Sequence, residues 1–80
     1  MPISSPNIAN SQPTARAVLA TNVVRLRNEK NWSQEMLGFE AGLHRTFIAH
    51  VERQVRNISI DNMEKIAKAL GVATFKLLEP

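Results

Sequence analysis

Two short amphipathic segments joined by a tight turn constrain the fold of this chain more than any other feature. They cover about residues 34–41 and 45–52, and the sequence Ala41-Gly42-Leu43 joins them. Glycine readily ends a helix because it adopts the left-handed backbone conformation at no steric cost. We therefore predict two short helices connected at Gly42, with the rest of the chain supporting them.

The size and composition of the chain limit how it can gain stability. Its 80 residues allow one domain with a small core. There is no cysteine, which excludes a disulfide, and only His44 and His50 offer imidazoles, so we expect no metal and no cofactor. Self-association is then the natural route to extra stability. The sequence has no apolar run of the roughly 18 residues that span a membrane and no export signal, which predicts a cytoplasmic protein.

Positive charge is concentrated in the first part of the chain. Lys and Arg number 10 and Asp and Glu 7, which gives a net charge of +3. Residues 1–57 hold seven basic and four acidic groups, whereas residues 58–80 hold three of each. The excess therefore lies in the part that contains the two short helices, where it favours binding to nucleic acid.

The remaining sequence divides into a tail and three further helices. Residues 1–13 contain three prolines among serines and asparagines, which predicts a flexible tail; a DNA-contacting arm is the alternative, although the tail has no Lys or Arg. Residues 14–80 form the domain, with further helices at about 14–30, 60–70 and 74–78. No segment has the pattern of a strand, so the predicted fold class is all-α, a compact domain of five helices.

Capping residues and apolar spacing predict the ends and the buried sides of the outer helices. Ser33 and Ser59 are placed to cap the helices that follow them, and Asn31 is suited to end the first helix in a left-handed conformation. Ile58 and Met63 have the spacing of a hydrophobic staple. The expected buried stripes consist of Ala15, Leu19, Val23 and Leu26 in the first helix and Ile60, Met63, Ile66, Ala67 and Leu70 in the fourth.

Gly38 lies in the middle of the predicted helix 34–41. Glycine at such a position costs about 1 kcal/mol relative to alanine, so something there favours the absence of a side chain. Close approach of the next helix explains it; simple tolerance of a weak helix former is the alternative.

The two faces of the predicted helix 45–52 differ in chemistry. At 100° per residue, Phe47, Ile48 and Val51 share one side and Arg45, Thr46, Ala49 and His50 share the other. The second side can donate and accept hydrogen bonds, as the reading of base edges requires, although an ordinary solvated face has the same pattern.

Residues spread over positions 19–78 recur together in one known family. They are Leu26-Arg27, Trp32-Ser33-Gln34-Glu35, Leu37, Ala41-Gly42-Leu43, Arg45-Thr46, Ile48, Val51-Glu52-Arg53 and Ile66-Ala67-Lys68-Ala69-Leu70-Gly71-Val72. In this order and spacing they resemble the lambda-repressor-like, Cro/CI-type (Xre) helix-turn-helix family. Within it, residues 52–60 look most like the controller proteins of restriction–modification systems.

This resemblance implies that the polar face of helix 45–52 enters the major groove of DNA. Arg45, Thr46 and His50 would then contact bases, and Arg45 suits a bidentate contact with guanine. An exposed histidine without a DNA contact is the alternative for His50. The candidate phosphate contacts are Ser33, Gln34, His44, Arg53 and Arg56.

His44 and Gln54 depart from the family pattern. His44 occupies the cap of helix 45–52, where relatives often have Ser, Asp or Asn; its imidazole can accept from a backbone amide or reach a phosphate. Gln54 stands where many relatives have a left-handed glycine, so either it accepts an unfavourable backbone angle or the turn is built differently. For Arg53 and Arg56, a solvated loop is the alternative to phosphate contact.

The resemblance also implies an ion pair between Arg27 and Glu52 that aims the DNA-reading helix. Because so small a core has few ways to cover apolar groups such as Phe75 and Leu78, we expect helix 60–70 and the last helix to form homodimer contacts through such residues.

The expected function is a sequence-specific transcriptional regulator that binds a near-palindromic double-stranded operator and blocks or recruits RNA polymerase. An antitoxin-like protein-interaction module with secondary DNA binding is the alternative. The sequence offers no nucleophile–base pair, carboxylate dyad, phosphate loop or metal set, so we do not expect an enzyme.

Overall fold

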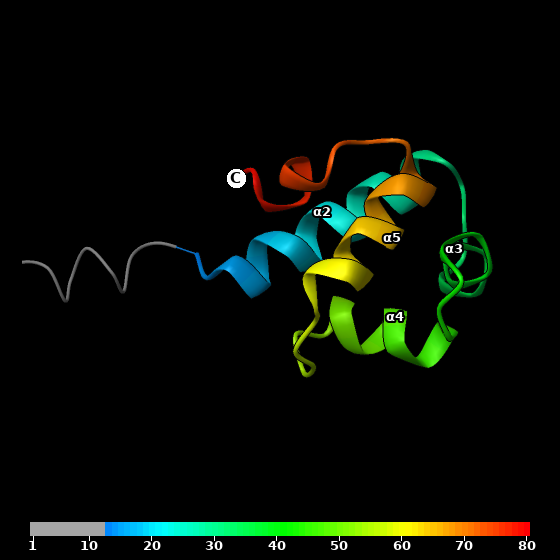
Figure 1. The fold of residues 1–80 in the computed structure, drawn as a ribbon, viewed down its shortest axis with the longest axis horizontal. Helices are drawn as coiled ribbons and strands as arrows, with labels where there is room; N and C mark the ends of the chain where they lie inside the picture. Colours follow the sequence, from blue (N-terminus) through cyan, green and yellow to red (C-terminus); the bar gives the residue numbers. More distant parts are fainter. Residues whose placement is uncertain (1–12) are drawn as a thin grey trace, which may run out of the picture.

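The structure, a computed structural model, describes residues 13–80. In chain order these residues form α2 (Ala15–Glu29), α3 (Gln34–Ala41), α4 (Arg45–Glu52), α5 (Ile60–Leu70) and the 3-10 helix η1 (Thr74–Leu78) (Figure 1). The part of the chain that is described has no strand, and the predicted all-α class is confirmed. The predicted tail lies outside the described residues, apart from Pro13.

The last helix differs from the prediction. Residues 74–78 form a 3-10 helix, not a fifth α-helix. A segment of five residues has little more than one α-helical turn, and the tighter 3-10 form is common in such short pieces. Its N-terminal end has no side-chain cap.

Each α-helix in residues 13–80 begins at a side chain that accepts a hydrogen bond from the first turn. The caps are Thr14, Ser33, His44 and Ser59, with distances of 3.0 Å from the acceptor atom to the backbone nitrogen in each case. The predicted caps Ser33 and Ser59 are therefore confirmed. These bonds satisfy amides that have no partner inside the helix, and they fix where each helix starts.

These four α-helices also end in the same way, each followed by one residue in the left-handed conformation. These residues are Asn31, Gly42, Gln54 and Gly71, with φ angles of 58°, 72°, 64° and 78°. In each case the amide of the following residue donates to the carbonyl five positions earlier, as in the Schellman motif; the bond from Val55 to His50, for example, is 3.1 Å long. Asn31 ends α2 as predicted, and Gln54 accepts the unfavourable angle.

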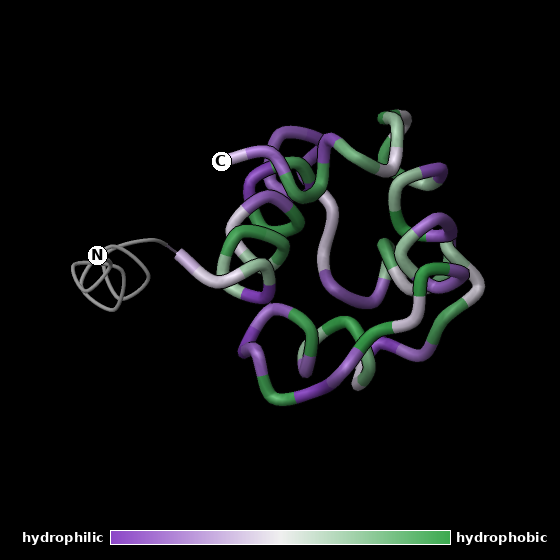
Figure 2. Tube along the Cα trace, turned by 60° about the vertical axis from the view of Figure 1, so that its left-hand side comes forward, coloured by the Kyte–Doolittle hydropathy of each residue, from purple (hydrophilic) through white to green (hydrophobic). Residues whose placement is uncertain are grey.

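The core is built from the apolar sides of all five elements. Its buried members are Leu19, Val23, Leu37, Ala41, Ile48, Val51, Met63, Ile66, Ala67, Leu70 and Leu77. Figure 2 shows how hydrophobic and hydrophilic residues alternate along the helices. Ile58 packs against this cluster next to the start of α5, as expected for a staple with Met63. No helix in residues 13–80 has the length and apolar character needed to cross a membrane.

Two residues predicted to be buried are exposed. Ala15 begins α2, whose first turn extends out of the helical bundle (Figure 1), so no other helix covers it. Ile60 is 65% exposed because it is the first residue of α5 and lies at the edge of the stripe formed by Met63, Ile66 and Leu70. Both errors arise at helix ends, where periodicity continues but the core does not.

Gly38 allows the turn between α3 and α4 to pack directly against α3. A Cβ atom at this position would lie 2.6 Å from the carbonyl oxygen of Leu43 and 3.2 Å from the amide nitrogen of Arg45. The predicted close approach is therefore confirmed, and simple tolerance of glycine is not the explanation. The missing side chain lets α4 start immediately beside α3.

Candidate nucleic-acid interface

The outer face of α4 carries the polar residues that the sequence places there. Arg45 and Thr46 are exposed at its N-terminal end, whereas Ile48 and Val51 are buried against the core. Phe47 is partly buried and packs against the same core, so the apolar side faces inward as predicted. The first turn of α4 therefore presents a guanidinium and a hydroxyl to solvent.

His50 is more buried than the other two predicted base contacts, Arg45 and Thr46. Its residue is partly buried, and its Nδ1 atom is buried without a hydrogen-bond partner in the structure. A buried ring nitrogen without a partner is uncommon in folded proteins. Only part of this imidazole is therefore available to a ligand on the outer face of α4.

An ion pair between Arg27 and Glu52 anchors the C-terminal end of α4 to α2. The Nε and Nη2 atoms of Arg27 donate to the two carboxylate oxygens of Glu52, at 2.7 and 3.0 Å. The side chains are only 14% and 6% exposed. This two-pronged geometry restricts orientation more strongly than a single hydrogen bond does.

Two further bonds complete this buried network. The side-chain nitrogen Nε2 of Gln34 donates to Glu52 at 2.8 Å, and Arg27 donates to the backbone carbonyl of Trp32 at 2.8 Å. The start of α3, the end of α4 and the last turns of α2 are thereby tied together. Sequence reasoning assigned Gln34 to a phosphate and missed its bond to Glu52; one of its two amide N–H groups remains for another acceptor.

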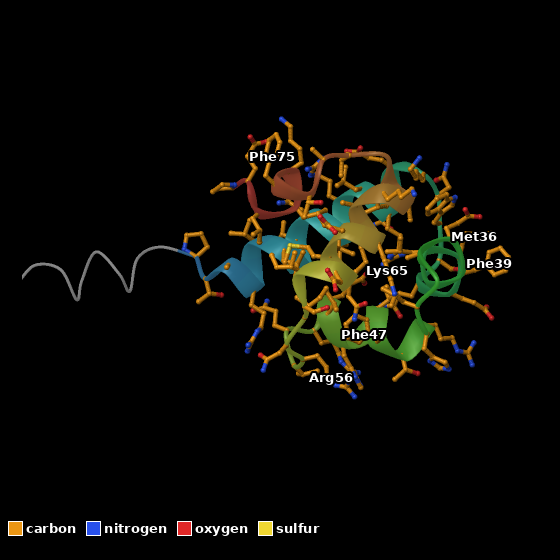
Figure 3. All side chains as sticks on the ribbon, viewed as in Figure 1. Met36, Phe39, Phe47, Arg56, Lys65 and Phe75 are labelled. Atoms are coloured by element: carbon orange, nitrogen blue, oxygen red, sulfur yellow. The ribbon has the colours of Figure 1, made fainter. Side chains whose placement is uncertain are left out.

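The other candidate phosphate contacts are exposed at the ends of α3 and α4 and in the segment after α4. Ser33 is exposed at the start of α3, and Arg53 and Arg56 are exposed in the segment after α4. Figure 3 shows Arg56 at the side of the molecule where α4 lies. Of the two roles open to His44, the structure contains the backbone contact, in which Nδ1 accepts from the amide of Thr46 at 3.0 Å. That nitrogen is therefore occupied, although the residue is exposed.

Among the described residues, Arg45 has only a weak partner. Its Nη1 atom lies 3.7 Å from a carboxylate oxygen of Glu35, and both side chains are mostly exposed, at 65% and 73%. Such exposed pairs contribute between zero and about 1 kcal/mol. The guanidinium of Arg45 can therefore leave Glu35 for a better acceptor at little cost.

Two of the exposed apolar side chains lie on the other side of the molecule. Phe75 and Leu78 in η1 are 67% and 40% exposed. In Figures 1 and 3, η1 and Phe75 lie beside α2, opposite the edge formed by α4. A protein partner bound to η1 would therefore leave the outer face of α4 uncovered.

The fold and the geometry of α3 and α4 define a helix-turn-helix protein, and comparison with known families agrees. The helix-turn-helix family model matches residues 23–77. The chain is 52% identical over 65 residues to a hypothetical transcription factor of Neisseria meningitidis and 51% identical over 65 residues to control protein C.BamHI of Bacillus amyloliquefaciens. These matches cover 81% and 80% of this chain, and 61% and 80% of the two relatives.

Solved structures agree with the sequence relatives. The Neisseria transcription factor superposes with a TM-score of 0.81 at 49% identity, covering 85% of this chain and 82% of that one. The restriction–modification controller protein C.Esp1396I, solved as a tetramer with its natural 35-base-pair operator, gives 0.74 at 31% identity, covering 84% and 92%. The chain therefore belongs to the Cro/CI-type helix-turn-helix family, and its relatives include restriction–modification control proteins, as its sequence predicted.

Proposed function

We propose that this protein regulates transcription by binding a near-palindromic double-stranded DNA operator as a homodimer, in the manner of a restriction–modification control protein. The observation that carries the proposal is the outer face of α4, where Arg45 and Thr46 are exposed and the opposite end of the helix is anchored by Glu52. The related C.Esp1396I binds its own operator as a tetramer, which supports the same kind of ligand.

In the proposed complex α4 lies in the major groove. Arg45 donates to guanine O6 and N7, Thr46 contacts a thymine methyl group or a phosphate, and His50 contacts a base through the exposed part of its ring. Ser33, the free N–H of Gln34, His44, Arg53 and Arg56 contact phosphates on either side of the groove. Donors on both sides of the groove fix the register, and the base contacts select the sequence.

The proposed dimer brings two copies of α4 to the same side of the duplex. Phe75 and Leu78, exposed on η1, supply apolar surface for the contact between the copies. A twofold axis between them places the two reading helices about 34 Å apart, which is one turn of DNA. The operator is therefore expected to consist of two inverted half-sites with that spacing.

The proposed regulator is cytoplasmic, and the position of its binding site relative to a promoter decides whether it represses or activates transcription. A dimer that overlaps a promoter blocks RNA polymerase, and a dimer bound just upstream recruits it. The proposed role is that of a binding protein rather than an enzyme, and it involves no metal or cofactor. The relatives are control proteins and transcription factors, which favours this proposal over the antitoxin-like alternative.

Selection from a random duplex library, followed by sedimentation of the protein alone and with the selected duplex, tests the proposal. We expect an inverted repeat to be enriched and two chains to bind each selected site. The antitoxin-like alternative would instead be supported if the protein retained no particular DNA sequence and a pull-down recovered a stoichiometric protein partner.

Substitutions on α4 and in the segment after it should have different effects on DNA binding. Arg45→Ala removes a base contact and should reduce discrimination at one base pair of each half-site by about 1–3 kcal/mol. Arg53→Ala and Arg56→Ala remove phosphate contacts, so each should weaken all duplexes alike and reduce the salt slope by about one unit per contact. Titrations of selected and scrambled duplexes at several salt concentrations measure both effects. An unchanged preferred sequence in Arg45→Ala would contradict the proposed orientation of α4.

A further inference from the structure

Apart from the network of Arg27, Gln34 and Glu52, Asn22 is the one polar residue that is buried in the part of the chain the structure describes. It lies in the middle of α2 and is 6% exposed. Buried polar groups are stable only when their hydrogen bonds are satisfied, so the partners of this side chain indicate what it does. The DNA-binding proposal uses none of its atoms.

The side-chain amide of Asn22 bonds to the end of η1. Its Nδ2 atom donates to the carbonyl oxygens of Leu77 and Glu79, both at 2.9 Å, and a third carbonyl, that of Lys76, lies at 3.3 Å. Its Oδ1 atom accepts from Arg25 at 3.3 Å. Carbonyl oxygens can only accept, and the arginine can only donate, so the partners themselves fix which way the amide points.

Lys76 and Leu77 belong to the last turn of η1 and Glu79 follows it; the carbonyl of Lys76 also accepts from the amide of Glu79, at 3.4 Å. The last carbonyls of any helix lack intrahelical partners, and η1 also lacks a side-chain cap at its start. Asn22 therefore caps the C-terminal end of η1 from a different helix, 54 to 57 residues away in the sequence. Leu77, which is fully buried, is the other anchor of η1.

The two anchors fix the position of the exposed residues between and beside them. Phe75 and Leu78 are 67% and 40% exposed, on a helix of five residues. So short a helix has almost no stability of its own. The position of its apolar side chains therefore depends on the contacts that attach it to α2.

We propose that Asn22 is a positioning residue for the dimer interface. By holding the carbonyls of η1, it presents Phe75 and Leu78 in the arrangement that a second copy of the chain binds. This inference rests on the proposed function, because it assumes that η1 forms the dimer contact. It adds a residue in the interior of α2 on which self-association depends, although that residue itself lies beneath the surface.

The substitution Asn22→Asp tests this inference with almost no change in shape. A carboxylate cannot donate to the carbonyls and would be buried against their oxygen atoms. Asn28→Asp is the matched control, since it introduces the same charge on the same helix at an exposed position. Sedimentation equilibrium of the full chain measures the dimer dissociation constant, and circular dichroism at the same concentrations measures helix content.

We expect Asn22→Asp to raise the dimer dissociation constant by at least about ten-fold, which corresponds to 1.4 kcal/mol, with native helix content. Asn28→Asp should leave the constant within about two-fold, a change of about 0.4 kcal/mol. Unchanged dimerisation in Asn22→Asp would overturn the inference. A wild-type protein that stays monomeric would instead contradict the proposed homodimer itself.

Asn22→Ala is the milder second variant, and Phe75→Ala completes a double-mutant cycle with it. If Asn22 acts through Phe75, removing both should raise the dissociation constant scarcely more than removing Phe75 alone. Fully additive effects would overturn the inference. Loss of native helix content in both Asn22 variants would also overturn it, because Asn22 would then serve the core as a whole.

Discussion

The two ends of α4 are attached to the molecule in different ways. At the C-terminal end, the carboxylate of Glu52 is buried and accepts three hydrogen bonds, two from Arg27 and one from Gln34. At the N-terminal end, the single side-chain bond is from the amide of Thr46 to the exposed His44.

In the proposed DNA complex, this difference would separate the orientation of α4 from its contacts with bases. Breaking a buried ion pair costs about 3–5 kcal/mol, whereas an exposed pair such as Arg45–Glu35 contributes about 1 kcal/mol or less. One end of the helix is therefore held in a fixed direction. The other end keeps its hydrogen-bonding groups free for a ligand.

The largest effect is expected from removing the anchor of α4. Arg27→Ala leaves the carboxylate of Glu52 buried with only Gln34 as a partner, and it should lower the free energy of unfolding by about 3–5 kcal/mol. DNA affinity should fall as well, although Arg27 is not among the proposed DNA contacts. Urea denaturation measures the first effect and duplex titration the second.

Arg25→Ala is the matched control for this prediction. Arg25 pairs with Glu29 on the same helix, but both side chains are more than half exposed, so its removal should cost less than about 1 kcal/mol. Equal losses in the two variants would contradict the greater cost expected for the buried pair. Because Arg25 also touches Asn22, dimerisation is best measured separately in this variant.

A smaller effect is expected where α4 begins. In Gly38→Ala, the added methyl group would lie 2.6 Å from the carbonyl oxygen of Leu43, which forces the turn away from α3 and should cost about 1–3 kcal/mol. Glu40→Ala, at an exposed position of α3, should change stability by less than about 0.5 kcal/mol. Thermal denaturation compares the two. A stabilised Gly38→Ala would mean that helix propensity outweighs the clash.

The smallest effect, with the opposite sign, is expected just beyond the C-terminal end of α4. Gln54→Gly relieves a left-handed residue at φ 64° and should stabilise the protein by about 1 kcal/mol. Asn31→Gly makes the same change after α2 and should give a smaller gain, because asparagine tolerates this conformation better. Urea midpoints of the two variants rank the gains; a larger gain at Asn31 would contradict this explanation.

Local signals made much of the fold predictable from the sequence. The bounds of α3 and α4 agree with the prediction because Ser33, Gly42 and their neighbours specify helix ends through bonds of short range. The apolar side of α4 was predictable for the same reason. The predicted burial of Ala15 and Ile60 was wrong, because periodicity does not reveal where the core ends.

Long-range polar contacts were predictable only where a family resemblance supplied them. The resemblance implied the pair of Arg27 and Glu52, which lie 25 residues apart. It assigned Gln34 to a phosphate without its bond to Glu52, and nothing marked Asn22, whose carbonyl partners lie more than 50 residues away. A side chain that bonds to backbone atoms leaves no complementary residue type in the sequence to find.

The backbone reversal at Gln54 also determines how long α4 is. Eight residues at about 1.5 Å each give a rod of about 12 Å, which is close to the width of the major groove of B-form DNA. One more helical turn would carry Arg53 and Arg56 past the wall of that groove. In the proposed DNA complex, the end of α4 at this point would leave both exposed arginines beside the sugar–phosphate strand at the rim of the groove.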